Sequence, residues 1–263
     1  MALTVRRRQR LSRVVQYGIL VVVALVLALV ADWPALAGAF LNLDVAREQF
    51  PGIIVTALKN TLIYTALGFV LGLSGGMVLA LMRLSSVAPY RWLATGYIEL
   101  FRGIPALLVF IAFGYGIPTA FGVRFDTYIT VMLALGMVSA AYIAETLRAG
   151  LQAVPSGQME AARSLGMSRA RAMVTIVVPQ AFRIVLPPLT NEIILLTKDS
   201  SLVYLLGLTI GQYELTKFGR EGITAPGAGL TPLVLAGACY LVITIPLGLL
   251  ARRFENKVGR SAR

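Results

Sequence analysis

Six runs of apolar residues constrain this 263-residue chain more than any other feature. A helix crosses the hydrocarbon core of a bilayer with about 20 residues, because each residue adds about 1.5 Å along the axis. The runs lie at about 14–30, 53–82, 92–117, 128–151, 184–206 and 230–250. The sequence therefore predicts an all-α, polytopic membrane protein with six spans.

Composition supports this class. Apolar residues make up 57% of the chain and charged residues only 14%, a balance that water-soluble surfaces rarely show. The formal charge of +12 would suit nucleic-acid binding only if the basic residues shared one exposed face. They fall instead at the ends of the apolar runs, where they indicate membrane topology and contact with anionic lipid. We expect membrane lipid as a partner and no nucleic acid.

The first apolar run admits two interpretations. Five arginines precede it, which is the layout of a transmembrane helix and also of a secretory signal peptide. The run is long for a signal peptide, and Ala31-Asp32-Trp33-Pro34 is a poor cleavage site. The sequence favours a retained first span, with cleavage as the alternative.

Lysine and arginine are distributed unequally between alternate connections. Seventeen lie in the N-terminal arm, the connection after the second run, the connection between the fourth and fifth runs together with Arg148 near the end of the fourth run, and the C-terminal tail. Only four lie in the opposite set of connections. Because positive segments tend to stay in the cytoplasm, we expect both termini to be cytoplasmic.

The long connection between the fourth and fifth runs is amphipathic rather than apolar. Pro155-Ser156-Gly157 predicts a turn into a short helix capped by Ser156 or Gly157, and Gly166 is well placed to end that helix. A second short helix, 168–178, should stop before Pro179. Residues 155–179 would then form a compact foot below the membrane. From the pattern alone, a helix lying on anionic lipid is the alternative.

The foot also carries a recognisable motif. Glu160-Ala161-Ala162, followed by Gly166, Ile176 and Pro179, resembles the EAA loop in membrane subunits of ATP-binding-cassette (ABC) importers. Val178 stands where that motif usually has leucine. Other segments resemble the polar amino acid permease family, which contains the histidine and glutamine permeases. Those segments are 56–61, 99–105, 144–148, 179–183 and 198–202.

The resemblance covers about residues 52–253 and implies a division of the chain. Residues 52–253 would form the five-helix importer permease core, with the coupling loop at 155–179. Residues 1–51 would hold the basic arm, one extra N-terminal transmembrane helix and an external loop. Residues 254–263 would form a basic cytoplasmic tail.

The resemblance further implies import of a polar amino acid by alternating access in the inner membrane of a bacterium. The implied partners are a cytoplasmic ATP-binding subunit, a second permease copy or homologue, and an extracytoplasmic solute-binding protein. The foot would rest in a groove of the ATP-binding subunit, as a mechanical contact and not a catalyst. The coupling residues carried over are Gly157, Glu160, Ala161, Ala162, Gly166 and Pro179.

Polar residues inside the apolar runs are candidates for the substrate pathway, because ionisable groups at membrane depth usually face a cavity or a partner. Pro187-Pro188 and the polar residues after them predict a broken fifth helix, which would line the pathway together with part of the second. The candidates are Asn60, Thr61, Glu99, Arg102, Asn191, Glu192, Lys198, Asp199 and Ser200. The alternative is structural, with Glu99 paired to Arg102 and Lys198 to Asp199, as Glu145 is expected to pair with Arg148.

Other functions leave weaker traces in the sequence. A secondary transporter would show an internal repeat, and none is visible between residues 1–130 and 131–263. A membrane-bound enzyme would need a nucleophile and a base, but the chain has no histidine, and Cys239, its one cysteine, lies in an apolar run.

The same composition predicts no metal site and no cofactor. Without a Gly-rich phosphate loop, ATP hydrolysis is expected in a partner chain. An ABC importer for another small polar solute is the remaining alternative.

Overall fold

The computed structural model describes residues 5–261, and all regular structure in that range is helical. The α-helices are α1 (Val5–Val30), α2 (Trp33–Phe40), α3 (Leu43–Glu48), α4 (Lys59–Leu84), α5 (Ala88–Gly103), α6 (Ala106–Ile111), α7 (Ile117–Phe121), α8 (Thr127–Gln152), α9 (Ser156–Ser164), α10 (Arg169–Ala172), α11 (Val178–Asp199), α12 (Leu215–Gly222) and α13 (Thr231–Ser261). Wider π-helical turns lie at Ile53–Leu58, Ala112–Gly116 and Met173–Val177, and 3-10 turns at Ser200–Leu205 and Ile210–Gln212.

Five helical segments in the described range are long and apolar enough to cross a membrane, and a bent pair of helices gives a sixth if the pair is counted as one span. The five are Ser12–Val30, Ile53–Leu84, Thr127–Gln152, Arg169–Leu205 and Thr231–Lys257. These segments and the bent pair coincide with the six predicted runs, and the all-α polytopic class is confirmed.

Helices α4 and α8 cross closely at the centre of the molecule because small residues line their contact. A Cβ atom added to Gly68 would lie 2.6 Å from Leu135 Cβ, and one added to Gly136 would lie 2.7 Å from Leu71 Cβ. Such separations are below any real carbon contact, so only glycine lets the two helix backbones approach this far. Tyr64 of α4 is fully buried in the core cluster beside this crossing.

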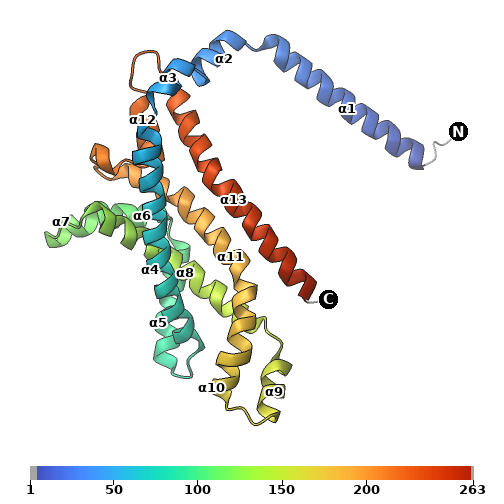
Figure 1. Ribbon diagram of the computed structural model, residues 1–263, viewed down its shortest axis with the longest axis vertical. Helices are drawn as coiled ribbons and strands as arrows, with labels where there is room; N and C mark the ends of the chain where they lie inside the picture. Colours follow the sequence, from blue (N-terminus) through green and yellow to red (C-terminus); the bar gives the residue numbers. More distant parts are fainter. Residues whose placement is uncertain (1–4, 262–263) are drawn as a thin grey trace.

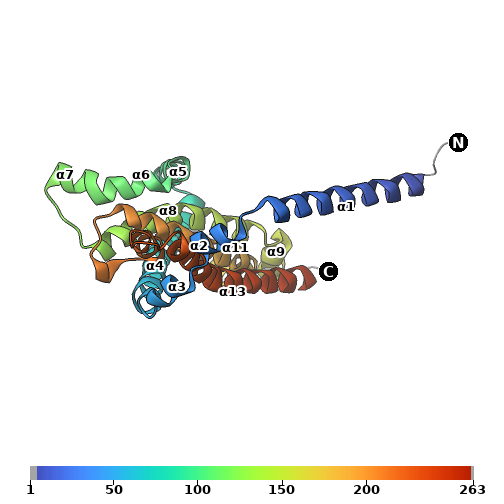
Figure 2. The same ribbon diagram turned by 90° about the horizontal axis from the view of Figure 1, so that it is seen from above.

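The third predicted run is not one straight span. Helix α5 ends at Gly103, α6 begins at Ala106, and the two directions differ by 102°. Pro105 explains the break, because it disfavours helical geometry at Ile104 and cannot donate a backbone hydrogen bond. Figure 2 shows α5, α6 and α7 along one edge of the molecule.

The predicted break of the fifth run at Pro187-Pro188 is wrong, whereas the predicted interruption near Ser200 is found. The helical segment begins at Arg169, passes Pro179 through the π-helical turn Met173–Val177, and continues through Pro187 and Pro188 to Asp199. A wide turn removes the clash that a proline ring makes with the preceding turn, so Pro179 lies in the first turn of α11 instead of ending the helix. The regular helix gives way only at Ser200, where a 3-10 turn follows.

The two ends of the bundle differ. In Figure 1, α9, α10 and the α4–α5 turn lie at the lower end, while α2, α3 and α12 lie at the upper end. Helix α1 leads away from the bundle, and no residue of its apolar window is buried. An apolar helix exposed on all sides needs a non-aqueous surrounding, as a lipid-facing span does.

Candidate functional site

The foot consists of α9 and the first turns of the next helical segment, joined at Gly166 as predicted. The predicted end of the second short helix before Pro179 is wrong, because that segment continues into α11. Gly166 has φ +83°, a left-handed conformation that L side chains rarely adopt. The Met167 N–H donates to Ala162 O at 3.1 Å, and the Gly166 N–H donates to Arg163 O at 3.0 Å. These two bonds are the Schellman pattern that ends a helix on glycine. The predicted start of α9 is wrong by one residue, since Pro155 is its N-cap and no side chain caps it.

The foot is attached to the membrane helices by an apolar cluster. Met159 of α9 packs against buried Val154, Val177 and Ala181, which lie just after α8, just before α11 and within α11. The Gln180 amide also donates to Ile176 O at 3.0 Å. Because these contacts link α9 to both neighbouring spans, a force on the foot acts on α8 and α11 together.

The residues carried over as coupling contacts lie on the surface of the foot, with one exception. Gly157, Glu160, Ala161, Gly166 and Pro179 are exposed, whereas Ala162 is 5% exposed and packs inward.

Leu165, which was not among the predicted coupling residues, is 85% exposed at the tip of the foot. It is the C-cap residue of α9, directly before Gly166 in the turn to α10, and no sequence pattern marked it as exposed.

A cavity of about 470 Å³ lies between the α5–α6 bend, α8 and α11. Arg102, Glu192 and Asp199 are the charged residues that line it, together with Ser139 and Tyr142 of α8. This volume falls in the usual range for small-molecule sites. The other predicted residues of α11 and of the 3-10 turn after it lie outside the lining: Asn191 and Lys198 are exposed, and buried Ser200 donates to Thr197 O at 2.7 Å.

Asn60 and Thr61 also lie outside this cavity. Both are buried, and the Asn60 amide donates to Gly211 O at 2.8 Å and to Tyr213 O at 3.0 Å. Thr61 Oγ1 donates to Ala57 O and accepts from the Leu215 N–H. In this conformation these two side chains fasten the connection before α12 to the upper part of α4.

Glu214 is a buried carboxylate that the sequence did not single out. It precedes α12, outside the membrane-spanning segments, and it accepts hydrogen bonds from the Thr216 and Lys217 N–H groups at 2.6 Å each and from Tyr240 Oη at 3.0 Å. Burial raises its pKa to about 7, against the opposing effect of these donors. No sequence pattern distinguished it from an ordinary exposed helix cap.

Glu99 and Arg102 do not pair, so this predicted alternative is wrong in the present conformation. Glu99 is exposed, and among the described residues the two side chains form no ion pair. The Arg102 guanidinium lies instead over the Tyr142 ring, 5.7 Å from its centroid. This cation–π contact holds Arg102 at the cavity wall.

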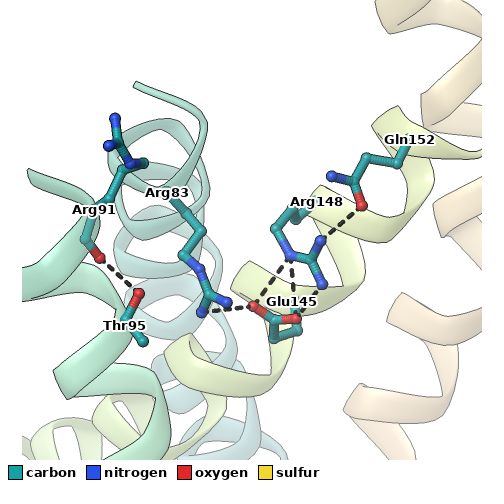
Figure 3. A network of polar contacts seen from close by, with 6 residues as sticks. All are labelled: Arg83, Arg91, Thr95, Glu145, Arg148 and Gln152. Atoms are coloured by element: carbon teal, nitrogen blue, oxygen red, sulfur yellow. Dashed lines mark hydrogen bonds and ion pairs between the residues drawn. The ribbon is translucent and has the colours of Figure 1, made fainter. Parts of the chain in front are cut away.

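Glu145 and Arg148 do pair, and a second arginine joins them. Figure 3 shows the Glu145 carboxylate between Arg148, at 2.6 Å, and Arg83 of α4, at 3.3 Å. Arg148 also donates to Gln152 Oε1 at 2.6 Å. The network ties the lower ends of α4 and α8 and does not contribute to the cavity lining.

Comparison with known proteins gives concordant results. Residues 72–260 match the family described as the binding-protein-dependent transport system inner membrane component. The arginine transport system permease protein of Bacillus subtilis (strain 168) is 34% identical over 220 residues, covering 83% of this chain and 98% of that protein. The glutamate/aspartate import permease protein of Escherichia coli O157:H7 is 36% identical over 213 residues, covering 78% and 93%.

A solved structure agrees with the sequence relatives. The crystal structure of an amino acid ABC transporter with histidines matches with a TM-score of 0.73 at 34% identity, covering 81% of this chain and 96% of that one. The match extends over nearly the whole length of each relative. This chain therefore belongs to the family of binding-protein-dependent transport system inner membrane components.

Proposed function

We propose that this chain is the membrane-spanning permease subunit of an ABC importer and carries a polar amino acid inward. The observation that supports it is the foot. In a chain of this family, a helix that exposes Glu160 and Ala161 and ends before Gly166 is fastened to two spans. The relatives' names, which mention arginine and glutamate/aspartate, support an amino acid as the solute.

The geometry suggests how the foot reaches the substrate. It connects the end of α8 to the start of α11, and the same two helices carry Ser139, Glu192 and Asp199 into the cavity. A rigid movement of the foot therefore displaces two walls of the cavity against the α5–α6 bend. Such a movement can open the cavity to alternate sides of the membrane.

The proposal includes partners and topology. A separate cytoplasmic subunit binds the foot and hydrolyses ATP. An extracytoplasmic binding protein delivers the solute, and a second permease copy or homologue completes the pore. Residues 52–253 form the importer core between the extra N-terminal span and the basic tail. Both termini face the cytoplasm of a bacterial cell, which the excess of basic residues on that side supports.

Coexpression with a candidate ATP-binding subunit tests the proposal. We expect the wild type to copurify with that subunit and to stimulate ATP hydrolysis in the presence of solute. Glu160→Ala removes an exposed carboxylate, and Gly166→Pro forbids the positive φ; both should uncouple hydrolysis while the chain still inserts. Glu48→Ala, an exposed position on α3 at the other end, is the matched control.

Failure of any ATP-binding subunit to associate with the wild type would contradict this function and favour a secondary transporter.

A further inference from the structure

We infer that the cavity between α5, α8 and α11 selects amino acids with a cationic side chain. This inference rests on the proposed import function and adds to it the substrate class. The relatives' names do not decide the class, because they mention both a cationic and two acidic amino acids.

The charges that line the cavity are unequal. Two carboxylates, Glu192 and Asp199, face it together with one guanidinium, Arg102. The neighbouring charged residues Glu99 and Lys198 are exposed and lie outside the lining. The cavity side chains, in their ordinary ionised forms, therefore sum to one negative charge.

Neither cavity carboxylate has a direct partner in the described part of the chain, although Lys198 attracts Asp199 from a longer distance. Among the described residues, Glu192 and Asp199 accept no hydrogen bond and form no ion pair within 4.0 Å, although both are half-buried on a membrane-spanning helix. Glu145 of α8, by contrast, is held by Arg83 and Arg148. A carboxylate at membrane depth carries a free-energy cost unless it pairs with a cation. A cationic ligand that pairs with Glu192 and Asp199 would therefore bind favourably.

The spacing of these groups suits a cationic amino acid. Glu192 and Asp199 are seven residues apart on α11, so they share one face and stand about 10.5 Å apart along the axis. Such a substrate has an ammonium group at one end and a second cation at the far end of its side chain. The two cations can meet the two carboxylates, while the Arg102 guanidinium takes the substrate carboxylate, for which its planar fork is suited.

Other amino acids leave charges unpaired. A neutral amino acid such as glutamine satisfies Arg102 and one carboxylate and leaves the second carboxylate without a cation. A glutamate substrate would place its side-chain carboxylate against that second carboxylate. Unpaired or like charges in a partly dehydrated cavity oppose binding, so the order should be cationic, then neutral, then acidic.

Equilibrium binding to the purified complex of this chain with its ATP-binding subunit tests the inference. Without a solute-binding protein, radiolabelled L-arginine should bind and be displaced by L-lysine, while L-glutamine and L-glutamate should compete at least about tenfold more weakly. Glu192→Gln should weaken arginine binding about tenfold or more, through loss of a charged hydrogen bond, and leave glutamine binding unchanged. Glu48→Gln, the same exchange on α3 outside the cavity, should bind as the wild type.

Three outcomes would overturn the inference. They are equal or tighter binding of glutamine or glutamate by the wild type, no arginine binding at all, and unchanged arginine affinity in both Glu192→Gln and Asp199→Asn. If Glu192→Gln does not assemble, Asp199→Asn and the wild-type competition series decide. An assembled complex with active ATPase and the wrong selectivity would contradict only the inferred substrate class. A chain that binds no ATP-binding subunit would contradict the proposed importer function itself.

Discussion

Gly72 of α4 lies where that helix crosses α8, and replacing it with alanine should disrupt the crossing. The new Cβ would overlap Ser139 Oγ and stand 3.0 Å from Ser139 Cβ and 3.4 Å from Ile143 Cδ1. The Ser139 hydroxyl is buried and donates to Gly136 O at 3.2 Å and to Gly68 O at 3.4 Å. It must therefore leave its acceptors or push α8 away.

The cost can be estimated from these contacts. Losing the hydroxyl's hydrogen bonding costs about 1 kcal/mol, and residual overpacking costs about 1–3 kcal/mol. Alanine is a better helix former than glycine by about 1 kcal/mol, which offsets part of this. The net destabilisation of Gly72→Ala should be about 1–3 kcal/mol. Adding Ser139→Ala removes the overlapping oxygen and should bring the double variant back close to wild type.

Thermal unfolding in detergent measures this order of stabilities. Cys239 is the one cysteine and is only half-buried, so a thiol-reactive fluorophore reports its exposure on heating. The apparent melting temperature should be lowest for Gly72→Ala and higher for Gly72→Ala with Ser139→Ala. Gly237→Ala on α13 is the matched control, because an added Cβ there meets nothing within 4 Å.

A Gly72→Ala variant as stable as wild type would refute this account of the α4–α8 crossing. So would a double variant no more stable than the single one, because the cost would then not come from Ser139.

Three further predictions concern other parts of the molecule. Gly166→Ala forces a Cβ into the left-handed region and should cost about 1–2 kcal/mol locally, seen as faster proteolysis of the foot than in Gly157→Ala, whose position has ordinary φ. In the folded protein the pKa of Glu214 is raised to about 7. The stability that Glu214 contributes is therefore greatest at pH values below the pKa of the unfolded chain and is lost as the pH rises through about 7. The melting temperature should fall as the pH rises over that range, and it should fall less in Glu214→Gln. Glu145→Gln leaves Arg83 and Arg148 close together without a carboxylate and should lower the melting temperature. Glu255→Gln, on the exposed end of α13, is the control for a general effect of charge removal and should lower it less.

The sequence was most informative where local chemistry determines structure. Apolar length located the spanning helices, and the glycine at 166 located the end of α9, since both features depend on residues close in sequence. The structural effect of proline was predicted less well. Pro105 produces the 102° bend between α5 and α6, whereas Pro187 and Pro188 leave α11 continuous. The difference lies in whether the helix and its neighbours can satisfy the freed backbone groups, which a sequence does not display.

The partners of the candidate pathway side chains were likewise not predictable from the sequence. Polar residues on a span must meet some partner, but the partner is fixed by tertiary packing. Asn60 meets backbone carbonyls of the connection before α12, whereas Glu192 and Asp199 face the cavity. Arg102 meets the Tyr142 ring rather than Glu99, although the spacing of three residues allowed an ion pair.

Site-directed cross-linking tests the central claim, that the foot is the contact with an ATP-binding subunit. In a Cys239→Ala background, Leu165→Cys places a thiol at the exposed tip of the foot, and Leu43→Cys places one on α3 at the other end of the bundle. We predict that membranes containing both subunits yield a cross-link to the ATP-binding subunit from position 165 and none from position 43. Cross-linking from 43, or none from 165 in a complex that still copurifies, would contradict the account.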